Sequence, residues 1–202
     1  GTIIEPRSSW AMIHEHFGTD NTEMLQLYID HKISDKEFVK ADIQLWNSKS
    51  ERLVDEKYIN SILDKAKARK GAEELITSLH ENNIKTIILS GGIQYLADKW
   101  AKKWNMNEAL ANDLIDDENG NLTAIINSSG HNKGPVMEKM IEKYNCEKNE
   151  IAAVGDTIVD VPTFERAGLS IAVNTDDERV ISKANYHLKG DLTELKKLII
   201  NW

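Results

Sequence analysis

The sequence lacks several features that would place a protein in a class at once. Of its 202 residues only Cys146 is a cysteine, which excludes an internal disulfide framework and fits a reducing cytosol. The net charge of −8 argues against a broad nucleic-acid surface, because phosphate backbones need clustered Lys and Arg. No apolar run approaches the roughly 20 residues of a membrane helix, and no signal peptide or internal repeat is visible. We therefore predict a cytoplasmic globular protein whose partners include neither nucleic acid nor a membrane.

The first third of the chain carries apolar residues at helical spacing and no strand pattern. Ser34 and Glu37 form a capping box, which predicts a helix that starts there. Its inward face is predicted to hold Phe38, Ala41 and Leu45. Further helices are predicted within residues 8–17, around residues 24–28 and over residues 55–66. This part of the chain is typical of a small helical domain.

Beyond residue 70 short apolar runs alternate with amphipathic helices. The Asn119-Gly120 pair predicts an antiparallel hairpin between two of these runs. Strands that alternate with helices indicate an α/β fold, in which helices cover both faces of a parallel sheet. Ligands on such sheets bind beyond the carboxyl ends of the strands. The other buried strands are predicted at residues 84–90, 151–156, 169–174 and 186–190.

Two polar features fit an anion site at these strand ends. Ser90, Gly91 and Gly92 close the first apolar run, where glycine backbone can approach an anion and the next helix offers free N–H groups. Lys133 opens a predicted helix, where its charge opposes the helix dipole, so a phosphoryl group or carboxylates would account for it better than solvent. Taken alone, each feature also fits a plainer interpretation, namely an ordinary strand-to-helix turn and a solvated lysine.

A pair of carboxylates follows the second buried strand. Asp156 and Asp160 lie four positions apart at the mouth of residues 151–156 and can face one point. Oxygen ligands of this kind suit Mg²⁺, which prefers one or two carboxylates plus waters. Asp160 could instead cap the following helix, but that interpretation leaves Asp156 unexplained.

The order of these features is more specific than any one of them. The segments ILSGG, NKGPVM and AVGDTIVDVPTFERAG resemble motifs two, three and four of the haloacid dehalogenase superfamily, in its phosphoserine phosphatase-like branch. The resemblance covers essentially the whole chain. It implies a three-layer, Rossmann-like core of residues 1–6 and 70–202, with a helical cap of residues 7–69 inserted after motif one.

The resemblance also implies an Mg²⁺-dependent phosphatase that acts on a small phosphorylated metabolite through an aspartyl-phosphate. Asp156 would bind the metal, and Asp160 would support it directly or through its waters. Lys133 would screen the nucleophile and the phosphoryl group. The phosphoryl oxygens would be held by Ser90 and by the N–H groups of Gly91 and Gly92.

The start of the chain matches only the end of motif one, a strand followed by Asp-x-Asp-Gly-Thr in this family. Gly1 and Thr2 look like its last two residues, with Thr2 supporting the loop. On this hypothesis an upstream segment would hold the nucleophilic Asp, the general acid–base Asp and the central strand of the sheet. Glu5 is the nearest acid in the chain as given, but it lies on the way to the cap. We therefore expect the chain as given to be inactive. A chance Gly-Thr pair is the alternative.

Three departures from the branch concern the substrate. Phosphoserine phosphatases recognise the amino-acid part of their substrate with an acidic residue after motif one and an Arg in the cap. Here Arg7 stands at the first position and Asp42 near the second, which puts phosphoserine in doubt. Arg7 could meet a second anionic group of the substrate or pair with Glu5 at the surface. Motif four carries Val159 where the branch often has Asn.

Two rival hypotheses stay open beside the enzyme. One is a non-catalytic phosphate-binding or regulatory protein of the same superfamily that lacks motif one. The other is a receiver-like α/β protein, against which the helical insert and the order of the motifs argue. The sequence leaves the oligomeric state undetermined.

Overall fold

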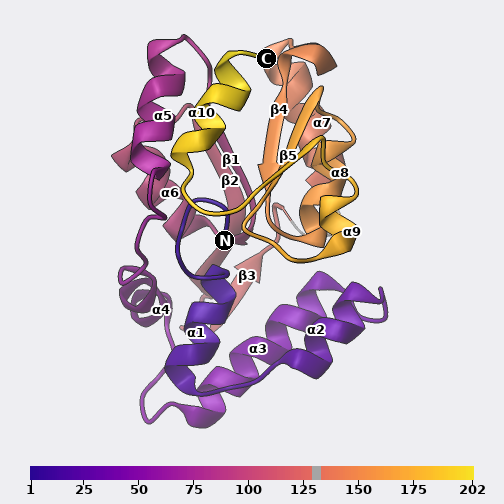
Figure 1. Ribbon diagram of the computed structural model, residues 1–202. Coiled ribbons are helices and arrows are strands. Elements are labelled where there is room, and N and C mark those ends of the chain that lie inside the picture. Colours follow the sequence, from indigo (N-terminus) through magenta and orange to yellow (C-terminus); the bar gives the residue numbers. More distant parts are fainter. Residues whose placement is uncertain (129–132) are drawn as a thin grey trace.

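The computed structural model describes residues 1–128 and 133–202. Helices α1 to α4 form the lower part of the molecule, and the strands with the remaining helices form the upper part (Figure 1). The helices are α1 (Ser9–Phe17), α2 (Thr22–Ile29), α3 (Asp35–Lys49), α4 (Glu56–Leu63), α5 (Ala72–Glu81), α6 (Gln94–Lys103), α7 (Lys133–Tyr144), α8 (Val161–Phe164), α9 (Glu178–Ile181) and α10 (Thr193–Ile200). Single-turn helices η1 (Lys148–Glu150) and η2 (Ile158–Asp160) precede β4 and α8.

The strands form two sheets of three strands each. In the first sheet, β1 (Ile87–Ile93) pairs in parallel with β2 (Glu108–Asp116), which pairs antiparallel with β3 (Leu122–Ile125) in the predicted hairpin. In the second sheet, β4 (Ala152–Gly155), β5 (Leu169–Val173) and β6 (Tyr186–Leu188) are all parallel. The α/β class is confirmed, and the described strands lie in two separate sheets. The reason is that β1 and β4 share no ladder, so each is paired along one edge within the described residues.

Strand β1 differs from its predicted extent in a way that affects the site. The sequence predicted a strand at residues 84–90 followed by a helix, whereas the strand runs on to Ile93 and α6 starts at Gln94. The register between β1 and β2 shifts between Leu89 and Ile93, across the two glycines. Gly91 and Gly92 are therefore part of an irregular strand and not of a strand-to-helix turn.

Short-range hydrogen bonds cap three helices of the helical part, and the predicted capping box is one of them. The capping box of α3 is present: Glu37 N–H donates to Ser34 Oγ at 3.3 Å, and Ser34 N–H donates to Glu37 Oε2 at 2.8 Å. Asp55 caps α4 by accepting the Tyr58 N–H at 2.7 Å. Ser8 caps α1.

The predicted inward face of α3 is wrong in part. Phe38 is buried as predicted, but the other buried positions are Val39, Asp42 and Trp46 rather than Ala41 and Leu45. The reason is tertiary: the Trp46 indole donates to His14 on α1 at 3.3 Å, and Asp42 lies 3.2 Å from the other ring nitrogen of His14. A buried carboxylate on this face was not predictable from hydrophobic spacing.

One buried apolar cluster runs from the helical part into the sheets. It joins Ile13 and Trp46 below to Leu75 and Ile171 above. The two segments that connect the parts also lie together, because Ile4 and Ala68 form an isolated antiparallel bridge. The boundaries of residues 1–6, 7–69 and 70–202 stay a prediction.

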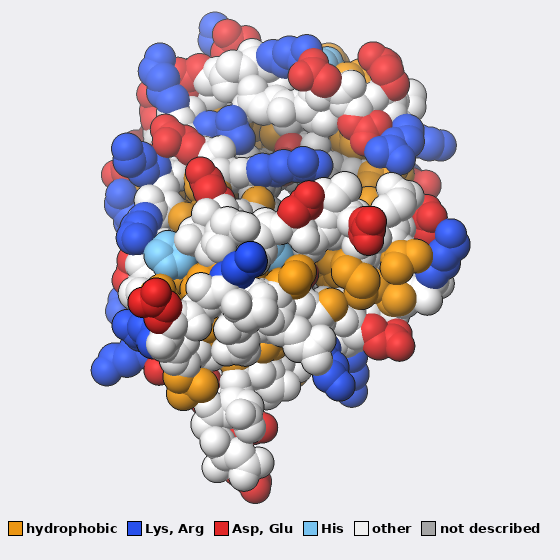
Figure 2. Space-filling model, turned by 90° about the horizontal axis from the view of Figure 1, so that it is seen from below, with side chains coloured by type: hydrophobic (Ala, Val, Ile, Leu, Met, Phe, Trp, Pro, Cys, Tyr) orange, Lys and Arg blue, Asp and Glu red, His pale blue; other side chains and the backbone are white. Residues whose placement is uncertain are grey.

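The face seen from below carries charges of both signs. Figure 2 shows Lys, Arg, Asp and Glu side chains distributed around this face and hydrophobic side chains gathered over one part of it. Among the described residues, no helix is both long and apolar enough to span a bilayer.

Candidate active site

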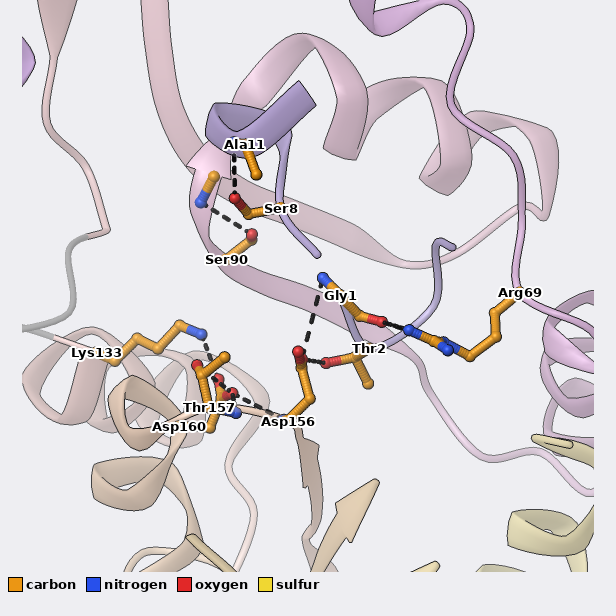
Figure 3. Close-up of polar contacts among 11 residues, drawn as sticks. Gly1, Thr2, Ser8, Ala11, Arg69, Ser90, Lys133, Asp156, Thr157 and Asp160 are labelled. Carbon is orange, nitrogen blue, oxygen red and sulfur yellow. Dashed lines mark hydrogen bonds and ion pairs between the residues drawn. The ribbon is translucent and has the colours of Figure 1, made fainter. Parts of the chain in front are cut away.

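The predicted site residues come from both sheets and from the start of the chain. Figure 3 shows Ser90 in β1, with Gly1 and Thr2 between it and Asp156, which follows β4, and with Lys133 and Asp160 beside Asp156. Because the carboxyl ends of parallel strands lie at one edge of a sheet, residues distant in sequence meet here.

The most buried polar pair of the site is Lys133 with Asp160. Lys133 is 5% exposed and Asp160 is 7% exposed, and the Lys133 Nζ lies 2.5 Å from Asp160 Oδ1. The other carboxylate oxygen of Asp160 accepts the N–H groups of Asp156 and Thr157, both at 3.0 Å. Burial by itself raises the pKa of Asp160, but Lys133 and these N–H donors outweigh it, so the pKa lies below its ordinary value. Asp160 is therefore held as a carboxylate.

Both oxygens of Asp160 are occupied by protein groups, which distinguishes it from Asp156. Asp160 braces the lysine and the turn that carries Asp156. The turn also depends on Gly155, because a Cβ there would lie 2.4 Å from the Asp160 Cβ. The sequence analysis did not identify Gly155 as a required residue, although it precedes Asp156 in the quoted motif.

Asp156 is held by the start of the chain. Its Oδ1 accepts the Thr2 hydroxyl at 2.7 Å and lies 4.0 Å from the Gly1 nitrogen (Figure 3). Its side chain is 14% exposed. The Arg69 guanidinium in turn donates to the Gly1 carbonyl at 2.7 Å and 3.2 Å. Arg69 was missed by the sequence analysis, since its place in the second connecting segment carries no motif.

The Ser90 segment is held by hydroxyl groups. The Gly92 N–H donates to Ser90 Oγ at 3.0 Å, and the Ile93 N–H donates to Ser9 Oγ at 3.0 Å. The Gly91 carbonyl accepts two side-chain donors, Trp10 Nε1 and Asn112 Nδ2. The Gly92 N–H, which was expected to be free for an anion, is therefore paired within the protein, and so is the Ile93 N–H.

Arg7 and Asp42 occupy different environments. The Arg7 side chain is exposed, and its backbone carbonyl lies beside Gly1, since a Cβ on Gly1 would be 2.7 Å from it. Among the ion pairs of the described residues, none joins Arg7 to Glu5. Asp42 is fully buried among the helices, where it accepts a hydrogen bond from Asn21 at 3.1 Å. Of these two residues, only Arg7 is exposed.

The motifs imply a bound Mg²⁺ ion, which takes oxygen ligands. No cluster of three or more His, Cys, Asp or Glu side chains occurs among the described residues. One partly exposed carboxylate, Asp156, still fits Mg²⁺, which uses one or two carboxylates and otherwise keeps its waters.

Comparison with known proteins gives one family and consistent relatives. A family model for haloacid dehalogenase-like hydrolases matches residues 3–168. A phosphoserine phosphatase of Archaeoglobus fulgidus is 33% identical over 122 residues, which cover 59% of this chain and 35% of that protein. One of Campylobacter jejuni subsp. doylei is 30% identical over 132 residues, covering 64% of this chain and 62% of that protein. The chain thus spans less than two thirds of the length of these relatives.

Solved structures agree with this on the fold. A substrate-bound phosphoserine phosphatase superimposes with a TM-score of 0.80, covering 98% of this chain and 93% of that one at 23% sequence identity. At that identity the likeness establishes the shared α/β architecture.

Proposed function

Because the chain belongs to the haloacid dehalogenase-like hydrolase family, we propose that it acts as a phosphomonoester hydrolase of the phosphoserine phosphatase-like branch. The observation that carries the proposal is the Lys133–Asp160 pair, a buried cation and anion that also brace the turn of Asp156. Burying two charges is costly unless geometry and hydrogen bonds compensate. Such a pair at the carboxyl ends of the strands supports a site for a charged substrate.

Each residue has a role set by its position. Lys133 places a positive charge close to Asp156 and so attracts a phosphoryl group. The Ser90 hydroxyl, whose oxygen accepts the Gly92 N–H, can donate its own proton to a phosphoryl oxygen. Thr2 orients the Asp156 carboxylate through its hydroxyl. Mg²⁺, when bound, neutralises charge on the phosphoryl oxygens, and Asp156 with water would hold it.

The attacking carboxylate is proposed to come from a strand that pairs between β1 and β4, upstream of Gly1. Two observations support this: β1 and β4 share no ladder, and Gly1 lies between Ser90 and Asp156. Asp160 is fully engaged with Lys133 and the Asp156 turn, so it is not available to attack. The carboxylate oxygen would form a bond to phosphorus as the bond to the alcohol oxygen breaks, and a second carboxyl group would protonate the alcohol. Water would then release phosphate and restore the carboxylate.

Helices α1 to α4 are proposed to form a cap over this site. Figure 1 places them beneath the strands, on the side where the start of the chain lies. A cap of this size limits the substrate to a small phosphorylated metabolite. Arg7, exposed and unpaired with Glu5, is proposed to meet a second anionic group of that metabolite.

The test compares two proteins on a panel of phosphomonoesters with Mg²⁺. One is residues 1–202, and the other is the same chain extended by the residues encoded directly upstream. We expect turnover only in the extended protein, and only while an upstream Asp is present, so an Asp→Asn variant there is the matched control. Ordinary enzymatic turnover by residues 1–202 alone would contradict the proposed nucleophile. Phosphate binding without turnover in the extended protein would support a non-catalytic phosphate-binding protein instead.

A further inference from the structure

The Gly91 carbonyl accepts hydrogen bonds from two side chains that lie on different elements. Trp10 Nε1, on α1, and Asn112 Nδ2, on β2, both donate to its oxygen at 3.0 Å. Asn112 is itself fixed, because its side-chain oxygen accepts the N–H groups of Asn127 and Ser128, each at 2.9 Å. Trp10 is fixed by stacking on Trp46, with ring centroids 6.0 Å apart.

A carbonyl held in this way also fixes the next N–H group. The Gly91 carbonyl and the Gly92 N–H belong to one planar trans peptide, so they point in opposite directions. Glycine on both sides would otherwise let this peptide plane rotate, because glycine has the widest range of backbone angles. The two hydrogen bonds to the Gly91 carbonyl therefore fix the direction of the Gly92 N–H. In the structure this N–H points toward Ser90 Oγ.

We propose that Trp10 and Asn112 are positioning residues for phosphate binding: they hold the Gly91–Gly92 peptide so that the Gly92 N–H stays directed at Ser90 Oγ and orients that hydroxyl toward a bound phosphoryl oxygen. The inference rests on the proposed function, since it concerns the same anion site. It also ties phosphate affinity to the position of α1, because Trp10 belongs to the helical part while Gly92 belongs to the sheet. Loss of the Trp10 bond should loosen the peptide even though Trp10 does not touch the ligand.

The experiment uses the Trp10→Phe variant, which removes the indole N–H and keeps an aromatic ring to stack on Trp46. The matched control is Trp100→Phe, because the Trp100 N–H is buried without a hydrogen-bond acceptor among the described residues. The probe is inorganic phosphate, titrated against the full isotope-labelled chain while the Gly92 amide is followed by NMR. The amide exchange rate of Gly92 is measured without phosphate in the same samples.

We expect Trp10→Phe to raise the Kd for phosphate about fivefold, the factor that corresponds to one neutral hydrogen bond of about 1 kcal/mol. Exchange of the Gly92 amide should accelerate by a similar factor, and Trp100→Phe should change neither quantity. Unchanged Kd and unchanged exchange in Trp10→Phe would overturn the inference.

Two further readouts separate this inference from the proposed function. If the unaltered protein binds no phosphate, the proposed function fails, and the Gly92 exchange rate alone then decides whether the peptide is held. If Trp10→Phe does not fold, the scalar coupling across the bond from Trp10 Nε1 to the Gly91 carbonyl is measured in the unaltered protein. Absence of that coupling overturns the inference, and its presence with a slow Gly92 exchange rate supports it.

Discussion

At the scale of single residues, the site depends on one carboxylate that faces inward. Asp160 accepts from Lys133 with one oxygen and from the Asp156 and Thr157 N–H groups with the other. A buried pair of this kind contributes little net stability by itself, because desolvation offsets the attraction. Its value lies in geometry, since a single side chain sets the position of both the lysine and the Asp156 turn.

Removing the negative charge of Asp160 should destabilise the folded protein. Asp160→Asn would leave the Lys133 ammonium buried without a counter-charge, and we expect the free energy of unfolding to fall by about 3–5 kcal/mol. Urea denaturation measures the change. Asp30→Asn is the control, because Asp30 pairs with Lys32 on the exposed surface and should leave the midpoint unchanged. A loss in Asp160→Asn no larger than in the control would show that the buried pair does not form.

The lowered pKa of Asp160 has a consequence for acid stability. The unfolded carboxyl titrates near its ordinary pKa of 3.8, while the folded one stays charged to lower pH. Between these two values the unfolded state binds more protons, so stability falls as the pH falls. This contribution of Asp160 to stability is fully present above the pKa of the unfolded state. It is lost as the pH falls through the pKa of the folded state.

We therefore expect the melting temperature of the unaltered protein to fall below pH 4 in part through this group. In Asp160→Asn the fall over the same range should be shallower. Equal slopes for the two proteins, measured by thermal denaturation from pH 6 to pH 3, would rule out this linkage.

At the scale of elements, α1 and β1 are joined tightly where the two parts of the molecule meet. Ser9 and Trp10 reach from the first turn of α1 to the backbone of Ile93 and Gly91. Gly92 lies in this joint with no room for a side chain, because a Cβ would be 2.7 Å from Ser9 Oγ. The glycine is thus required by helix packing as well as by any approach of an anion.

Gly92→Ala should therefore destabilise the joint by about 1–3 kcal/mol, the usual cost of overpacking. Ser9→Ala removes the atom that the new methyl group would meet, although it also loses the bond to the Ile93 N–H. We expect the double variant to be less destabilised than the sum of the two single variants in a denaturation cycle. If the destabilisations of the two single variants simply add up in the double variant, the new methyl group does not clash with Ser9 Oγ.

At the scale of the whole molecule, the unjoined edges of β1 and β4 are the main open feature of the fold. Buried backbone groups without partners cost on the order of 1–3 kcal/mol each. A strand that pairs with both edges would join the two sheets into one. The same strand would bring its carboxyl end to the space between Ser90 and Asp156, so stability and activity should depend on it together.

Hydrogen exchange can test this directly. In the protein extended upstream of Gly1, amides of Ala152–Gly155 and Ile87–Leu89 should exchange more slowly than in residues 1–202, and the melting temperature should rise. Strand Tyr186–Leu188, at the far edge of the second sheet, serves as the internal control and should not change beyond the global effect. Identical exchange at β1 and β4 in the two proteins would contradict strand insertion.

The sequence by itself determined the features that depend on neighbours along the chain. The Ser34 capping box and the antiparallel hairpin were both predicted, because each rests on residues a few positions apart. The order of Ser90, Lys133 and Asp156 was sufficient to identify the superfamily, which the family model confirms.

Only the tertiary structure decided the contacts that cross the fold. The Thr2 bond to Asp156 spans 154 positions, and the Ile93 bond to Ser9 spans 84. Periodicity and capping carry no information about such pairs, since they arise from how helices and sheets pack after they have formed. For the same reason the buried face of α3, the inward Asp160 carboxylate and the grip of Arg69 on Gly1 emerged only from packing.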